Sequence, residues 1–308
     1  MNDMSASVET GACRTSPRKA WAAALFSFLV PGLGQLYAGS PGRALVAALA
    51  ALAAELLAIP LAMMLRGGTQ LLLITLIAIF VNIIIPWDAF RRAHEATPRF
   101  ALRYYNRWYV YTPLLLISAL VVRPAIFRFT KAHIARAFGL PSTSMQPGLL
   151  VGDFVLSRIR RGPTHRGEIV AYKFADEIFL KRIVGIPGDT LNMNHGVLLV
   201  NGRAINEPYT IESDTSIAPA EGFSWQRKYL ISGIDSLSYH PTPNTWGPIV
   251  VPSRQYFVLG DHRSESEDSR YQEFVDDRAI IAEPTTVYFS RDPESKTIRW
   301  RRIGIAVR

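Results

Sequence analysis

The sequence predicts an all-β C-terminal domain that follows an α-helical transmembrane region. Two observations support this fold class. Apolar residues crowd the first 122 positions of the 308-residue chain, in runs long enough to span a bilayer. From Leu150 onward, short runs rich in β-branched and aromatic residues alternate with Gly, Asp and Pro, a pattern typical of strands and turns.

The first part of the chain, residues 20–122, is predicted to be a multi-helix transmembrane region after a disordered cytoplasmic N-terminus at 1–19. The candidate membrane helices are the apolar runs 44–65, 71–90 and 108–122. An earlier apolar run is interrupted by Pro31-Gly32-Leu33-Gly34. We therefore expect 20–38 to be re-entrant or interfacial. The alternative is a full crossing with an outside N-terminus.

The segment 91–107 sets the predicted orientation, because its charges are arginines at 91, 92, 99, 103 and 107 together with Glu95 and His94. Cytoplasmic loops collect Lys and Arg, so this segment is expected inside. The helix that follows then places the rest of the chain outside. Residues 123–140 are basic and aromatic, and we expect an amphipathic connector on the outer headgroups.

Residues 141–308 are predicted to form the β-rich domain, with 205–250 as an inserted lobe because this stretch is richer in Pro, Ser and Thr and less periodic. The predicted strands are Phe154–Ile159, Glu168–Tyr172, Ile178–Val184, Val197–Val200, Gln255–Leu259, Thr285–Ser290 and Ile298–Arg302.

Composition excludes several functional classes. The net charge of +9 comes largely from Lys and Arg that flank apolar segments, which indicates a membrane surface rather than a nucleic acid. Cys13 is the only cysteine, and the six histidines lack the spacing of metal ligands. We therefore expect neither a metal nor another cofactor.

The candidate chemistry starts at Pro141-Ser142-Thr143-Ser144-Met145-Gln146-Pro147, where flanking prolines stiffen a segment with two serines. A serine hydroxyl needs an activating base. Lys181 lies in an apolar strand on the face shared by Phe179 and Ile183, where burial would lower its pKa. A Ser–Lys pair is an established hydrolytic arrangement. The alternative is a lysine that snorkels to solvent.

Five ordered motifs resemble those of bacterial type I signal peptidases, over about 139–308 apart from 205–250. They are Pro141–Pro147, Gly152-Asp153, Arg166–Val170, Lys181–Asp189 and Gly260–Arg270. The resemblance implies a membrane-anchored, extracytoplasmic β-domain with a signal-peptidase-like fold. It also implies a bacterial plasma (inner) membrane location and removal of signal peptides from exported preproteins.

The same resemblance implies a role for each polar residue. Ser144 is expected to be the nucleophile and Lys181 the general base. The Ser142 hydroxyl and the Ser144 N–H would stabilise the oxyanion. Ser266 would orient Lys181, and Asp268 and Arg270 would form a supporting ion pair. His262 stands where asparagine is usual, but Lys181 occupies the position of the family's base.

The resemblance also implies the kind of substrate. Substrates of type I signal peptidases carry small residues in an Ala-X-Ala pattern and bind as an added strand. By position, we expect the pocket to be lined by Leu140, Pro141, Met145, Leu149, Ile169, Phe179 and Leu180. Two other functions stay open: a dedicated maturation peptidase for a few exported substrates, and a non-catalytic membrane scaffold. The sequence leaves the oligomeric state open.

Overall fold

The computed structural model describes residues 17–96, 103–160, 162–211 and 221–308. The chain separates into two compact units. The helical unit is Met1–Ala62 with Leu72–Phe129, and the β unit is Met63–Leu71 with Thr130–Arg308. The prediction of disorder at 1–19 falls mainly on residues 1–16, outside the described residues.

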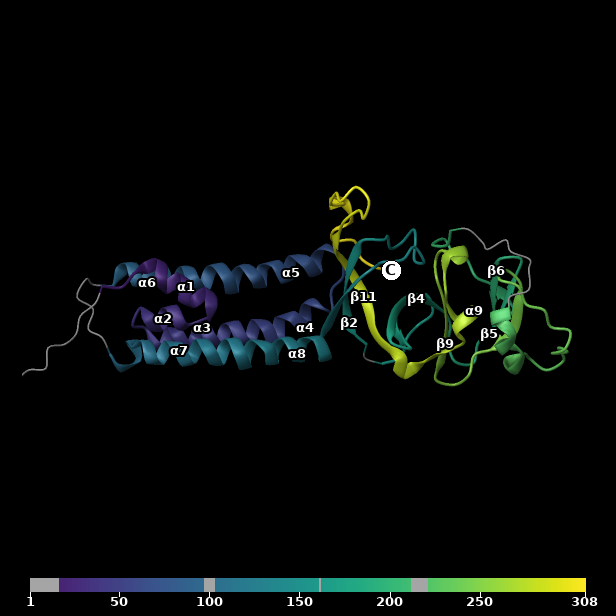
Figure 1. The fold of residues 1–308 in the computed structure, drawn as a ribbon, viewed down its shortest axis with the longest axis horizontal. Coiled ribbons are helices and arrows are strands. Elements are labelled where there is room, and N and C mark those ends of the chain that lie inside the picture. Colours follow the sequence, from purple (N-terminus) through teal and green to yellow (C-terminus); the bar gives the residue numbers. More distant parts are fainter. Residues whose placement is uncertain (1–16, 97–102, 161, 212–220) are drawn as a thin grey trace, which may run out of the picture. The chain divides into compact units, whose positions relative to one another are not determined.

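Among the described residues, three helices are long and apolar enough to cross a membrane: Pro41–Ala62, Gly68–Glu95 and Trp108–His133. A short π-helical stretch divides each of them, and Figure 1 labels the parts. These parts are α3 (Pro41–Ala53), α4 (Ile59–Ala62), α5 (Gly68–Ile79), α6 (Ile85–Glu95), α7 (Trp108–Ile117) and α8 (Arg123–His133). Each long apolar run of the sequence therefore lies mostly within one helix.

The first apolar segment folds into α1 (Ala20–Leu29) and α2 (Leu33–Tyr37) instead of one long helix. Ten residues are too few to cross a bilayer as a helix. A Cβ on Gly34 would lie 1.9 Å from the Ala23 carbonyl oxygen and 2.9 Å from the Ala89 Cβ. The glycine therefore allows α2 to pack directly against α1 and α6.

Residues 123–140, expected as an amphipathic connector, are divided between a helix and a strand. α8 continues the helix that begins at Trp108, because nothing after Pro124 breaks it before His133. β1 (Ala135–Gly139) then pairs with β2 (Asp153–Ile159). The sheet thus begins at Ala135, ahead of the domain start at residue 141 expected from the sequence.

The β unit contains a seven-stranded antiparallel sheet in the order β1-β2-β11-β3-β4-β9-β10. Its other strands are β3 (Ile169–Phe174), β4 (Glu177–Gly185), β9 (Gln255–Leu259), β10 (Val275–Asp276) and β11 (Ile280–Ser290). The prediction of an all-β domain after a helical membrane region is confirmed. A four-residue helix, α9 (Ser269–Gln272), follows β9.

A second, four-stranded sheet has the order β7-β6-β5-β8. Its strands are β5 (Thr190–Asn194), β6 (Val197–Val200), β7 (Arg203–Ala204) and β8 (Trp246–Val250). β8 belongs to the predicted lobe 205–250, and Phe223, Trp225 and Trp246 of this lobe enter one buried core with β5 and β6. The lobe is thus an integral layer of the β unit.

One predicted strand, Ile298–Arg302, is wrong. Ile298 makes only an isolated bridge to Arg291, and Trp300–Arg302 is a turn of 3-10 helix. Alternating apolar and basic residues gave the segment a strand-like pattern, but it lacks a continuous partner strand, and a strand is stable only when it is paired.

Candidate active site

The loop that carries the two candidate serines is fixed at both ends. Leu140 N–H donates to the Asp153 carbonyl (2.9 Å), and Leu149 N–H donates to the Met145 carbonyl (2.9 Å). Ser144 is 5% exposed, whereas Ser142 is exposed. Their Oγ atoms lie 3.1 Å apart. The loop therefore presents one sheltered and one open hydroxyl side by side.

Lys181 lies in the middle of β4, between β3 and β9. Its side chain is 3% exposed, unlike a lysine that snorkels to solvent. Burial lowers the pKa of Lys181 from 10.5 to about 8; the negative charge of Asp268 opposes this shift, and the positive charge of Arg270 adds to it. No ion pair joins Lys181 to a carboxylate in the described part of the chain.

Gly260 lies between the nucleophile segment and the strand of the base. Arg182, next to Lys181, pairs with Leu259 across β4 and β9. On the other side, His262 N–H donates to the Ser144 carbonyl (3.1 Å). A Cβ on Gly260 would lie 2.6 Å from that carbonyl oxygen and 2.2 Å from Ser266 Oγ. The fold therefore brings Ser144, Ser266 and the strand of Lys181 to one place.

Ser266, Asp268 and Arg270 are all buried and bonded to one another. Ser266 Oγ donates to Asp268 Oδ2 (2.7 Å), and Arg270 Nε donates to Asp268 Oδ1 (2.9 Å). Burial alone would raise the pKa of Asp268, but Arg270 and the surrounding hydrogen bonds hold it below its usual value. The Ser266 hydroxyl proton is thus directed to Asp268, which leaves the Ser266 oxygen free to accept a hydrogen bond from an ammonium group.

A second buried ion-pair network was not predicted from the sequence. Arg182 Nε and Nη2 donate to the two carboxylate oxygens of Asp261 (2.8 and 2.7 Å). The Arg182 guanidinium also lies 4.0 Å from the ring centre of Tyr209. Arg182 and Asp261 each adjoin a residue of the candidate site, a sequence signal that could have drawn attention to them. Tyr209 lies in the lobe, where no pattern pointed to it.

The predicted pocket residues separate into two groups. Leu140, Met145, Leu149 and Ile169 share one buried cluster, against which Leu180 packs. Phe179 instead packs in a different cluster with Tyr172 and Ile183. Neighbouring residues of a strand point to opposite faces, so Phe179 and Leu180 cannot line one pocket. Pro141 is exposed beside Ser142.

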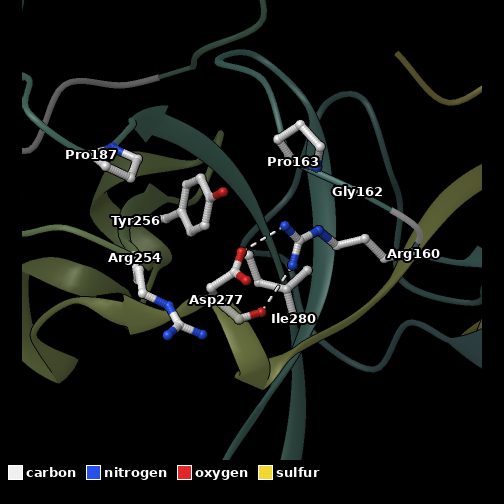
Figure 2. A pocket seen from close by; sticks show the side chains of 8 residues that line it. All are labelled: Arg160, Gly162, Pro163, Pro187, Arg254, Tyr256, Asp277 and Ile280. Atoms are coloured by element: carbon white, nitrogen blue, oxygen red, sulfur yellow. Dashed lines mark hydrogen bonds and ion pairs between the residues drawn. The ribbon is translucent and has the colours of Figure 1, made fainter.

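A cavity of about 440 Å³ lies elsewhere in the β unit and contains none of these residues. In Figure 2 the side chain of Arg160, the residue that follows β2, points toward Asp277. Arg160 Nη2 donates to Asp277 Oδ1 (2.6 Å), so these two charges satisfy each other. The residues lining the cavity include no serine and no lysine, so it cannot hold a Ser–Lys pair.

Comparison with known proteins agrees with the motifs around Ser144 and Lys181. Residues 109–289, more than half of the chain, match the family model described as signal peptidase, peptidase S26. The chain is 30% identical over 171 residues to the probable signal peptidase I-2 of Synechocystis sp., covering 52% of this chain and 64% of that protein. It is 37% identical over 156 residues to signal peptidase I S of Bacillus subtilis, covering 50% and 76%.

Among solved structures, the chain is similar to a signal peptidase I from Enterococcus faecalis V583. The alignment has 25% sequence identity and a TM-score of 0.26, and it covers 39% of this chain and 96% of that chain.

Proposed function

Because this chain belongs to the signal peptidase family S26, we propose that it is a membrane-bound serine endopeptidase that removes N-terminal signal peptides through Ser144 and Lys181. The observation that carries the assignment of the base is the buried Lys181, whose pKa is lowered to about 8. A lysine with such a pKa is partly neutral near physiological pH and can accept a proton.

In the proposed mechanism, neutral Lys181 takes the proton of Ser144 Oγ as this oxygen attacks the scissile carbonyl carbon. The negative charge that develops on the carbonyl oxygen is stabilised by the exposed Ser142 hydroxyl and the Ser144 N–H. The C–N bond then breaks, and the Lys181 ammonium gives its proton to the leaving amine. Water, activated by Lys181, hydrolyses the ester and restores Ser144.

Ser266 is proposed to hold the ammonium form of Lys181. Its hydroxyl donates to Asp268, and the Arg270 ion pair keeps Asp268 ionised. The partially negative Ser266 oxygen can therefore accept from Lys181 Nζ. In this role Asp268 and Arg270 act through Ser266 and do not contact the substrate.

We further propose exported preproteins with Ala-X-Ala signal peptides as the substrates. Leu140, Met145 and Leu149 are buried in one cluster around the serine segment, so we expect the substrate to meet a shallow floor rather than a deep pocket. Such a floor suits alanine-sized side chains. The preference is testable by replacing either alanine with leucine, which should lower kcat/KM.

The proposed location is a bacterial plasma membrane, with the β unit on the extracytoplasmic side. Residues 63–71, which comprise the turn after α4 and the first residues of the second long helix, belong to the β unit. We therefore place this turn outside, so that Pro41–Ala62 and Gly68–Glu95 form an in-out-in hairpin. The arginines between the second and third long helices then lie inside, as the positive-inside rule favours.

The test uses the full chain in detergent micelles with a peptide that spans an Ala-X-Ala cleavage site. Ser144→Ala should abolish cleavage, while Ser295→Ala, a matched change at an exposed serine, should not. Both variants should give the wild-type circular dichroism spectrum. Retained cleavage by Ser144→Ala would overturn the assignment of the nucleophile.

A further inference from the structure

The turn between the first two long helices is built into the β unit. Residues 63–71, the turn and the first four residues of α5, cluster with Thr130–Arg308, although the rest of α5 and the helix before the turn belong to the helical unit. A turn of a membrane hairpin needs only polar, exposed residues to reverse the chain. Gly67 and Gln70 are instead buried. This burial requires a specific partner within the β unit.

Gln70, at the start of α5, makes the central contact of this segment. Its side chain is 0% exposed. Gln70 Oε1 lies 3.0 Å from Thr285 Oγ1, and it also accepts a hydrogen bond from Thr286 Oγ1. Both threonines are buried residues of β11. An amide side chain that is fully buried and bonded to two strand hydroxyls fixes both the position and the register of the turn.

Two further contacts lie beside Gln70. Gly67 N–H donates to Thr286 Oγ1 (2.6 Å). Gly67 has φ of +65°, a conformation that favours glycine, and a Cβ there would lie 3.0 Å from the Gly304 carbonyl oxygen, so a side chain at this position fits only after a small shift of its neighbour. Arg66 Nη1 donates to the Val307 carbonyl (2.9 Å), and its Nη2 forms an ion pair with Glu283.

Glu283 connects this contact to the sheet. Its other carboxylate oxygen accepts from Arg158 Nη2 (2.7 Å), and Arg158 is its register partner on β2. The turn therefore contacts β11, reaches β2 through a shared carboxylate, and contacts the segment 304–307 that lies along β11. Hydrogen bonds from Gln70, the close backbone approach at Gly67 and the ion pair of Arg66 all involve β11. Such a combination of contacts is expected of a segment that is docked onto the strand.

We propose that residues 66–70, the docking turn, hold the β unit to the membrane hairpin at a second point, besides the chain connection at residue 129. The extra membrane helices thereby keep the catalytic residues available to substrates that are themselves in the membrane. This inference rests on the proposed function. Arg182, next to the base, is held by Asp261 and by the Gly167 and Arg308 carbonyls, none of which belongs to the docking turn, so we expect the chemistry itself not to depend on it.

The first test is a cross-link in the full chain with Cys13→Ser. A Cβ at position 67 would lie 3.4 Å from the Ala306 Cβ, close to the distance across a disulfide. Gly67→Cys with Ala306→Cys should form a disulfide on mild oxidation in membranes, seen as a reductant-sensitive mobility shift. Gly67→Cys with Leu237→Cys, an exposed lobe residue, is the control pair and should not. Absence of the first cross-link would overturn the proposal.

The second test compares two substrates for Gln70→Leu. In proteoliposomes, cleavage of a membrane-inserted preprotein should fall by about tenfold, because loss of a second tether lowers the effective concentration of the site. Cleavage of a short soluble peptide should stay near the wild-type rate. Thr112→Val, at an exposed threonine of α7 whose hydroxyl bonds to the Trp108 carbonyl of the same helix, should leave both rates unchanged.

The two assays separate the docking turn from the catalytic assignment. An equal loss on both substrates would indicate a general structural defect, and no loss on either would remove the tethering role. A failure of the Ser144–Lys181 assignment would show instead as peptide cleavage by Ser144→Ala, independent of the turn.

Discussion

The two units bury polar groups in different ways. In the helical unit, Ser27 and Gln35 are fully buried but uncharged, and Gln35 Nε2 donates to the Ile85 carbonyl (2.9 Å). In the β unit, the buried groups also include ion pairs: Arg182 with Asp261 and Arg270 with Asp268. Lys181 is buried beside these pairs without a carboxylate of its own in the described chain.

This difference in buried polar groups indicates that they have different roles in the two units. Buried amides and hydroxyls with satisfied hydrogen bonds fix the packing of helices at little electrostatic cost. Burying an amine without an opposite charge costs folding free energy, and titratable groups perturbed in this way cluster in active sites. The comparison predicts that removing Lys181 affects activity far more than stability, and that breaking the paired charges does the reverse.

The largest expected effect is on activity in Lys181→Met, which removes the amine and keeps a chain of similar length. Peptide cleavage should fall by about a thousandfold or more, because the proton of Ser144 then has no acceptor. Thermal unfolding should occur at the same or a higher temperature, since an apolar chain replaces a desolvated amine. Lys173→Met, at an exposed lysine, is the matched control. Normal cleavage by Lys181→Met would contradict the comparison.

Next in size is the loss of stability in Asp268→Asn. This change removes the carboxylate that forms an ion pair with the buried Arg270 guanidinium, which costs about 3–5 kcal/mol of unfolding free energy. Chemical denaturation of the full chain in micelles measures it. Asp176→Asn, at an exposed carboxylate, should change the unfolding free energy little. A loss no larger than that of this control would show that the ion pair is not a structural support.

The pH dependence of cleavage is expected to follow Lys181. Its ammonium form cannot accept a proton, so kcat/KM should rise with pH and level off above a pKa of about 8. Two pH units below, the rate should be about a hundredfold lower. Because burial lowers this pKa in the folded state, the folded protein binds fewer protons than the unfolded chain between pH 8 and 10.5, and unfolding free energy should rise over that window. A flat rate profile from pH 6 to 9 would contradict the role.

The smallest effect is expected in the helical unit, for Gly34→Ala. The new methyl would overlap the Ala23 carbonyl, so α1 and α2 must separate, at a cost of about 1–3 kcal/mol. Thermal unfolding in micelles should shift downward, while peptide cleavage should not change. Gly42→Ala, where a Cβ meets no atom within 4 Å, is the control. A change in peptide cleavage would show that the units are not as separate as the comparison requires.

Sequence reasoning was most accurate where the chain carries its own local signals. Val197–Val200 and Gln255–Leu259 were predicted with the observed bounds, because turn residues bracket both runs. β1 was missed because its basic and aromatic residues matched an amphipathic helix equally well. β5 was missed although polar and apolar residues alternate along it, and β8 was missed because Gly247 and Pro248 interrupt its apolar run. Their pairing with each other is visible only in the folded chain.

The candidate site was predictable only in part, because local motifs can be read from the sequence whereas contacts between distant segments cannot. Ser144, Lys181, Ser266, Asp268 and Arg270 lie within motifs that can be read from the chain. Tyr209 stacks under Arg182 through a contact that joins the lobe to β4, and no local pattern encodes it. The predicted pocket joined Phe179 and Leu180, although alternation along β4 places them on opposite faces and in contact with different clusters.

Gly260 also restricts which substitutions the candidate site can accept. A single added methyl group there would meet the Ser144 carbonyl at 2.6 Å and the Ser266 hydroxyl at 2.2 Å, so even alanine must displace one of them. Gly148, whose Cβ would meet its nearest neighbour at 3.7 Å, has room for alanine. In a library of random variants selected for cleavage, position 260 should therefore return only glycine, while position 148 should accept small side chains.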